Sequence, residues 1–224
     1  MRRRLVALLW NARSHRPRLP FRVTAAFVTL ALLNLPVAFL GPGFRDSIET
    51  IVVLGFPSST AAAVAGNVVF VSSQVIGYVG AVYLVGRFVD RRWFRDFGLH
   101  LDRDWWLDLG FGLVLGAGLM TGIFLVEAAI GWVSVTGVFR VAEPTFSFWP
   151  WLGWAFVILV TVGFTEELFA RGYLIKNLTE GLTWFEAIDG RRAVLLAVAG
   201  SAGVFAWGHY FNPNARLASV AGIA

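Results

Sequence analysis

The chain has 224 residues, of which 57% are hydrophobic and 15% charged; its net charge is +5, and it contains no cysteine. A soluble domain would carry about 25% charged residues, so the composition excludes an ordinary soluble protein. It predicts an all-α fold, a polytopic transmembrane helical bundle. The lack of cysteine excludes disulfides and thiolate metal sites.

The first 20 residues are basic and precede the first apolar stretch. Their arginines are Arg2, Arg3, Arg4, Arg13, Arg16 and Arg18. Such a run can belong to a signal peptide or a nucleic-acid-binding tail, but no small-residue cleavage site follows cleanly and further apolar spans come later. We interpret residues 1–20 as a cytoplasmic, positive-inside anchor.

Apolar stretches then alternate with charged loops. A first span covers residues 21–40 and ends at a Gly-Pro-Gly turn, residues 41–43. A second span is expected near residues 61–85, after a break at Pro57-Ser58-Ser59, and a third at residues 109–130. About 20 residues are enough to cross the hydrocarbon.

The last part of the chain adds a fourth helix, which begins near the aromatic residues of 146–151, and a fifth span at residues 193–209. An Asn-Pro-Asn turn at 212–214 precedes a sixth apolar stretch, 215–224, that is too short to cross. Basic residues are concentrated in alternate loops, which fits four crossings with a cytoplasmic N-terminus.

Two adjacent glutamates, Glu166 and Glu167, end a long charge-free stretch, and Arg171 follows four residues after the second. Ionisable groups at the bilayer centre cost about 2.5–3.5 kcal/mol each on insertion scales, so they are retained where they pair, line a wet cavity or do chemistry. Glu167 and Arg171 have the favourable i,i+4 order of acid before base. We expect this pair to leave Glu166 pointing elsewhere, where it can serve as a general base or acid.

His209 ends the next apolar stretch, and Phe205 lies one helical turn earlier on the same face, where its ring can wall the imidazole. His209 reaches the height of the glutamates only if the fourth helix continues through Tyr173 to Gly181. We therefore predict a long fourth helix whose last turns protrude or are interfacial. The fifth helix should pack antiparallel to it, with both groups in a cavity reached from the cytoplasm. We also expect close packing of this hairpin at its glycines, Gly200, Gly203 and Gly208.

Each of these features also has a plainer interpretation. The glutamate pair and arginine can be a helix boundary with a salt bridge, and a single histidine at the end of a span is commonly interfacial. Glu127 can serve helix packing, and the polar residues of 67–74 can form interhelical hydrogen bonds or a transport path. A hydrolytic zinc ion needs about three protein ligands and an open water position. The candidates are two carboxylates and one histidine; neither His15 nor His100 lies at a plausible place for a third ligand, and H-E-x-x-H is absent.

The segment Glu166-Glu167-Leu168-Phe169-Ala170-Arg171 resembles the E-E-x-x-x-R motif of the CAAX-protease and bacteriocin-processing family (CPBP, also called Abi) of intramembrane proteases, which includes the type II CAAX prenyl endopeptidases. Phe205-x-x-x-His209 resembles its F-x-x-x-H motif, and the resemblance covers residues 149–224. It implies that Glu166 and His209 activate the water that attacks a peptide carbonyl, while Glu167 and Arg171 orient and balance the charge. The motif leaves open whether a zinc ion takes part; if one does, Glu166 and His209 are the matching ligands.

The resemblance divides the chain into a basic cytoplasmic N-terminus (1–20), N-terminal transmembrane spans (21–145) and a protease-like core (146–224). It implies a multi-pass protein of the plasma membrane that cleaves a peptide or protein substrate, lipidated or not, in contact with the lipid bilayer and without a nucleic-acid partner. The family's third motif, a histidine with asparagine or a similar residue four positions later, is missing after His209. We therefore expect this chain alone to be inactive or badly impaired.

An alternative is a non-catalytic membrane scaffold, or an immunity or partner-binding protein, of the same fold. A transporter ranks last, because it would need polar groups at mid-depth along several spans.

Overall fold

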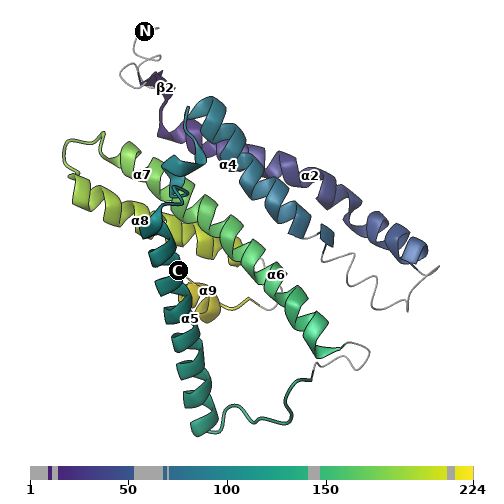
Figure 1. The fold of residues 1–224 in the computed structure, drawn as a ribbon. Coiled ribbons are helices and arrows are strands. Elements are labelled where there is room, and N and C mark those ends of the chain that lie inside the picture. Colours follow the sequence, from purple (N-terminus) through teal and green to yellow (C-terminus); the bar gives the residue numbers. More distant parts are fainter. Residues whose placement is uncertain are drawn as a thin grey trace. The chain divides into compact units, whose positions relative to one another are not determined.

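A computed structural model describes residues 10–11, 15–52, 68–69, 71–140, 147–210 and 215–223, with no side chains described for residues 11, 37–52 and 223 (Figure 1). The described residues are mainly helical, which confirms the all-α fold class. Within them, the strands β1 (Trp10–Asn11) and β2 (Arg16–Pro17) pair antiparallel, with Trp10 opposite Pro17.

The chain forms two compact units, one of residues Met1–Gly98 and Val157–Ala224 and the other of Leu99–Phe156. The predicted division at residues 20 and 145 stays a prediction. The smaller unit contains α5 (Arg103–Ala129) and the start of α6 (Phe148–Glu167). The Asp102 side chain caps α5 by accepting a hydrogen bond from the Trp105 amide at 2.9 Å.

The larger unit holds the end of α6 and a series of further helices. These are α2 (Leu19–Val52), the π-helix η1 (Val75–Val79), α4 (Gly80–Leu84), the π-helix η2 (Val85–Val89), the 3₁₀-helix η3 (Phe94–Phe97), the π-helix η4 (Leu168–Leu174), α7 (Ile175–Leu182), α8 (Gly190–His209) and α9 (Leu217–Ile223). In Figure 1, α4 runs beside α2, and α7 and α8 form an antiparallel hairpin.

Three described helical segments are long and apolar enough to cross a membrane: Leu19–Pro36, Arg103–Ala129 and Phe148–Leu182. No residue of α5 is buried by protein, as expected of a helix whose apolar surface contacts lipid. These segments identify an integral membrane protein. The predicted fifth span is present as the helix α8 but is not among the three, because Arg191, Arg192 and several glycines lower its mean hydropathy.

The turn predicted at residues 41–43 is wrong, because α2 continues through these residues to Val52. Within a membrane, a helix is the form that satisfies backbone polar groups internally, and glycine and proline are tolerated inside it where neighbouring groups compensate. The break expected at Pro57-Ser58-Ser59, the turn at 212–214 and most of the first half of the predicted second span lie outside the described residues.

The predicted long fourth helix is confirmed. α6, η4 and α7 follow one another without a break from Phe148 to Leu182, a run of 35 residues. This length carries the chain well past the glutamate pair before it turns back into α8. The hairpin therefore has arms long enough to bring the glutamates and His209 to a similar height.

Small residues on one face of α8 pack this hairpin. Ala193, Ala197 and Ser201 are spaced four residues apart and are all buried, and the Ser201 hydroxyl donates a hydrogen bond to the Ala170 carbonyl at 2.7 Å. Small residues at this spacing let two helix backbones approach in a membrane. The stripe, rather than the glycines, fixes the contact.

The predicted role of the α8 glycines is accordingly wrong within the described part of the chain. A Cβ atom at Gly203 or Gly208 would meet nothing within 4 Å, and one at Gly200 would make an ordinary contact with Leu178 at 3.6 Å. A glycine is required elsewhere, at Gly172 in η4, where a Cβ would lie 2.5 Å from the Phe97 carbonyl oxygen.

Candidate active site

The backbone changes its winding directly after the glutamate pair. α6 ends at Glu167 and the π-helix η4 begins at Leu168. π-Helical turns are rare in proteins, and those that do occur are often found at functional sites. Here η4 buries Phe169, whose ring packs edge-on against Phe27 at 5.3 Å and against Tyr78 at 5.5 Å between centroids. The chain around the glutamates is thereby fixed against α2 and η1.

The predicted pair of Glu167 and Arg171 is present. The Arg171 Nη1 atom lies 3.3 Å from Glu167 Oε1, and both side chains are about half exposed. Arg171 also places its guanidinium over the Phe205 ring, 4.8 Å from the centroid, which is a cation–π contact. One arginine thus contacts a residue of each motif.

Phe205 fixes the position of His209 through two separate contacts. The two rings pack at 4.5 Å between centroids, as predicted. In addition, His209 Nδ1 lies 2.9 Å from the Phe205 carbonyl oxygen. A carbonyl can only accept, so Nδ1 carries the proton of this hydrogen bond, and Nε2 of the neutral imidazole keeps its lone pair.

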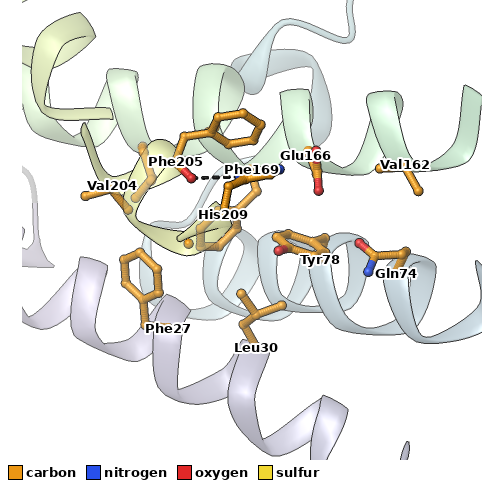
Figure 2. A pocket seen from close by; sticks show the side chains of 13 residues that line it. Phe27, Leu30, Gln74, Tyr78, Val162, Glu166, Phe169, Val204, Phe205 and His209 are labelled. Carbon is orange, nitrogen blue, oxygen red and sulfur yellow. Dashed lines mark hydrogen bonds between the residues drawn. The ribbon is translucent and has the colours of Figure 1, made fainter. Parts of the chain in front are cut away.

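Glu166 and His209 line one cavity of about 390 Å³. Figure 2 shows their side chains in this cavity, with Tyr78 and Gln74 on the wall opposite Glu166. The two candidate groups are close enough to interact electrostatically. Glu167 and Arg171 do not line the cavity and lie behind it. The remaining walls are mostly apolar: Phe27, Leu30, Val162, Phe169, Ala170, Leu174, Val204, Phe205 and Gly208.

Sequence patterns did not indicate Tyr78 as a functional residue, and for Gln74 they favoured interhelical hydrogen bonding. Both line the cavity, and Gln74 Oε1 is buried without a hydrogen-bond partner in the described structure. Their i,i+4 spacing places them on one helix face. That spacing of two polar groups inside an apolar stretch is the signal that would have found them.

The donor set around Glu166 does not make a complete zinc site. Among the described residues, no group of three or more histidine, cysteine, aspartate or glutamate side chains is placed to hold a metal ion. Glu166 and His209 supply two donors, whereas a hydrolytic zinc ion takes three protein ligands and a water. These residues alone therefore do not fit that ion.

The fold and the site together define a class: an all-helical integral membrane protein that holds a carboxyl and an imidazole from consecutive helices in one cavity. Residues 148–224 match the family model described as type II CAAX prenyl endopeptidase Rce1-like. The match covers about a third of the chain, includes all four predicted site residues and confirms the resemblance for this Rce1-like segment. Neither the curated proteins nor the solved structures contain a match to the chain.

Proposed function

We propose that this protein is an intramembrane endopeptidase of the CAAX-protease type, in which Glu166 and His209 activate the attacking water. The proposal is supported above all by one observation, that the two side chains come from different helices and line the same cavity. Ionisable groups are expensive inside a membrane. In a shared cavity, a carboxyl and an imidazole can act together on one water molecule. This activity would explain why the chain retains two such costly groups.

In the proposed step, water sits between the two side chains. Glu166 accepts one proton of the water as the general base, and the lone pair on His209 Nε2 accepts a hydrogen bond from the other O–H, which stays on the attacking oxygen and is oriented by this bond. The oxygen attacks the peptide carbonyl carbon. When the C–N bond breaks, the proton held by Glu166 passes to the leaving nitrogen, which returns the carboxylate to its initial state.

Glu167 and Arg171 act as positioning residues in this proposal. Arg171 neutralises Glu167 at 3.3 Å and packs on Phe205, and Phe205 holds His209 through both its ring and its carbonyl. Orientation of a catalytic group contributes to rate because a misplaced base loses its near-attack geometry. We infer that the charge balance of this pair is less important than the rigidity it gives to His209.

The wall opposite Glu166 offers donors for the substrate carbonyl. Tyr78 has a hydroxyl and Gln74 an amide group, and both face the cavity (Figure 2). We assign to them the stabilisation of negative charge that develops on the carbonyl oxygen during attack. Preorganised donors of this kind contribute on the order of 10²–10³ in rate.

We infer that the substrate is a peptide or protein segment presented from the membrane, with or without a lipid. The cavity walls formed by Phe27, Leu30 and Val162 are apolar and suit such a segment. We further propose that the N-terminus is cytoplasmic, on the strength of its arginines, and that the protein resides in the plasma membrane.

One observation favours a second candidate, a non-catalytic membrane scaffold or partner-binding protein of the same fold. The described residues provide two strong donors around the cavity, fewer than a hydrolytic zinc site needs. In that case the acid and the imidazole would serve packing alone. Their replacement would affect folding, and neither the wild type nor the variants would cleave a peptide.

The test is cleavage of a membrane-delivered peptide by the protein carrying Glu166→Gln or His209→Asn. We expect each variant to insert normally and to lose at least about 100-fold in kcat/KM. Glu127→Gln is the matched control, since it makes the same change in a membrane helix of the other unit, and it should retain wild-type activity. Wild-type cleavage by either site variant would refute the proposal.

A further inference from the structure

A second cavity lies at the other end of the larger unit. Its volume is about 590 Å³, and it is enclosed by the segment from β2 into the start of α2 and by the end of α7 with the turn that follows. The residues that determine its chemistry are Arg16, Arg18, Arg22, Glu180, Trp184 and Phe185. None of them belongs to the site of Glu166 and His209.

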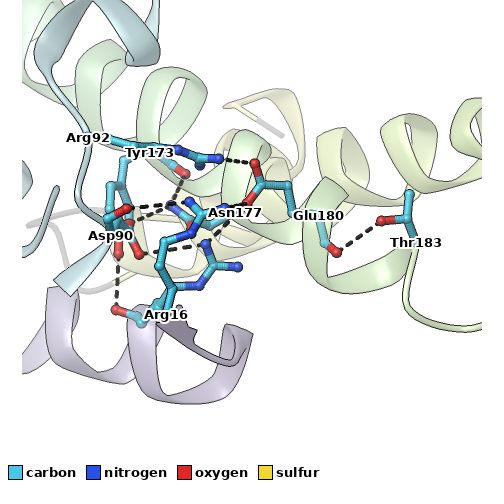
Figure 3. Close-up of polar contacts among 8 residues, drawn as sticks. Arg16, Asp90, Arg92, Tyr173, Asn177, Glu180 and Thr183 are labelled. Carbon is cyan, nitrogen blue, oxygen red and sulfur yellow. Dashed lines mark hydrogen bonds and ion pairs between the residues drawn. The ribbon is translucent and has the colours of Figure 1, made fainter. Parts of the chain in front are cut away.

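One wall of this cavity is a network of charged side chains (Figure 3). Arg22 is buried, and its Nη1 atom lies 3.1 Å from Glu180 Oε2 and 3.6 Å from Asp90 Oδ1. Glu180 also pairs with Arg92, and with Arg16 at 3.8 Å. The network joins α2, α7 and the residues after η2, so the wall is held in a defined geometry.

Neutral groups support the same network. The Tyr173 hydroxyl, fully buried, donates to the Arg22 carbonyl at 3.1 Å. The Asn177 amide donates to Asp90 Oδ2 at 3.2 Å and to the Tyr173 carbonyl at 3.0 Å. A wall fixed in this way keeps its arginines in place whether or not a ligand is bound.

Positive charge exceeds negative charge in this network. Among the described residues, the guanidinium groups of Arg16, Arg22 and Arg92 share two carboxylates, Asp90 and Glu180. Two buried nitrogens of the network, Arg22 Nε and Arg92 Nη1, have no hydrogen-bond partner in the described structure. Burial raises the pKa of the Asp90 carboxyl above its ordinary value, with Arg22 opposing.

The facing side of the cavity adds a cation on an aromatic ring. The Arg18 guanidinium lies 4.2 Å from the centroid of the Trp184 ring. Trp184 and Phe185 line the cavity and are 55% and 52% exposed, so their rings are accessible to a ligand. Tryptophan and arginine together at the end of a membrane helix are typical of the headgroup region.

The position of the cavity along two candidate membrane spans suits a lipid phosphate. The candidate span Leu19–Pro36 begins at its edge, and the candidate span Phe148–Leu182 ends there. The latter span has 35 residues, more than the roughly 20 that cross the hydrocarbon, so its last turns reach beyond the hydrocarbon. A cationic cavity at the edge of the hydrocarbon is adjacent to the phosphate groups of the lipids.

We propose that this cavity binds a phosphate group, that of an anionic phospholipid, between Arg16 and Arg18, with the adjoining apolar part of the lipid against Trp184 and Phe185. Guanidinium groups bind phosphate oxygens through paired hydrogen bonds, which suits them to this ligand. The binding is independent of the proteolytic activity proposed above. It would tie the N-terminal segment to the end of α7 at the membrane surface.

The experiment is a binding titration of the full chain, purified in neutral detergent, with short-chain phosphatidylglycerol, short-chain phosphatidylcholine and inorganic phosphate. We expect phosphatidylglycerol to bind more tightly than phosphatidylcholine. Arg18→Gln should weaken the binding of phosphatidylglycerol about fivefold, since one basic residue near a lipid surface contributes a factor of this size. Arg16→Gln combined with Arg18→Gln should remove the preference for the anionic lipid.

The control is the pair Arg95→Gln and Arg103→Gln, which removes the same charge outside the cavity and should leave the preference intact. Arg18→Gln keeps the buried ion pairs, so it tests the proposal even if the double variant does not fold. Binding of inorganic phosphate as tight as that of the lipid, lost in the same variants, would overturn the lipid assignment. Equal binding of both lipids, or unchanged binding by Arg18→Gln, would overturn the site itself.

Discussion

The Arg171 guanidinium lies over the Phe205 ring, 4.8 Å from its centroid, and this contact joins the two halves of the candidate site. On one side, Arg171 pairs with Glu167 beside the proposed base. On the other side, the Phe205 ring packs on the His209 ring, and the Phe205 carbonyl accepts a hydrogen bond from His209 Nδ1. These contacts connect Glu167 and Arg171, which do not line the cavity, to Phe205 and His209, which do, so we expect changes at the first pair to affect the second.

Arg171→Lys should therefore reduce kcat more than it changes KM. Lysine keeps the charge beside Glu167 but lacks the planar guanidinium that lies on Phe205. A cation–π contact contributes about 0.5–2 kcal/mol, so we expect kcat to fall about 3- to 30-fold in the cleavage assay. A kcat within twofold of wild type would show that the ring contact does not position His209.

The coupling between Arg171 and Phe205 can be measured directly. In a double-mutant cycle of Arg171→Met and Phe205→Leu, followed by thermal unfolding in detergent, we expect an interaction free energy of about 0.5–1 kcal/mol. Pairing either change with Phe164→Leu on the exposed surface of α6 gives the reference cycle, which should be additive. Additivity in both cycles would contradict the contact.

Tyr78→Phe should lower kcat about 10²-fold without a large change in stability. The substitution removes only the hydroxyl that we assign to the substrate carbonyl, and loss of one such donor costs about this much. Tyr83→Phe is the matched control, because Tyr83 is half-exposed and does not line the cavity. Equal kcat values for the two variants would show that the Tyr78 hydroxyl does not stabilise the substrate carbonyl.

The buried carboxyl of Asp90 predicts a pH-dependent stability. Because burial raises its folded-state pKa, its stabilising contribution is complete below about pH 3.9, the unfolded value, and is lost as the pH rises through the folded pKa. Relative to wild type, Asp90→Asn should gain in melting temperature over that range. Asp108→Asn, an exposed control in α5, should show no such trend. If the melting temperature of the wild type instead rises relative to that of Asp90→Asn as the pH increases, the prediction is contradicted.

The face of α8 that packs the hairpin can be tested with two substitutions. Ala197→Leu places a large side chain at a fully buried position and should destabilise the protein by about 1–3 kcal/mol. Gly203→Ala fills open space in the described structure and should be neutral or stabilise by up to about 1 kcal/mol. If Gly203→Ala destabilises the protein more than Ala197→Leu in thermal unfolding, the hairpin is packed at its glycines after all.

Helix geometry explains what the sequence could predict. The contacts of Glu167 with Arg171 and of Phe205 with His209 are i,i+4 pairs, so their spacing alone indicates them. The extension of the fourth helix, predicted to reach Gly181 and observed to reach Leu182, followed from a single requirement, that a carboxyl and an imidazole on consecutive helices reach similar heights. These are local or nearly local properties of the chain.

Other features depend on packing between distant segments, which spacing does not reveal. Both the glycines and the Ala193–Ser201 stripe of α8 are small residues, and only the fold decides which of them faces the partner helix. The π-helical turn after Glu167 and the meeting of Tyr78 with Glu166 are likewise set by tertiary contacts. The continuation of α2 through a Gly-Pro-Gly sequence shows that these turn residues do not by themselves end a helix.

Because the chain has no cysteine, the central relationship can be tested by cross-linking in membranes. Cysteines introduced as Glu166→Cys and His209→Cys should be joined rapidly by a short bifunctional maleimide, since both positions line one cavity. The pair Glu167→Cys and His209→Cys should react much more slowly, because Glu167 lies outside the cavity. Failure of the first pair to cross-link, or equal reaction of both pairs, would contradict the shared site of acid and imidazole.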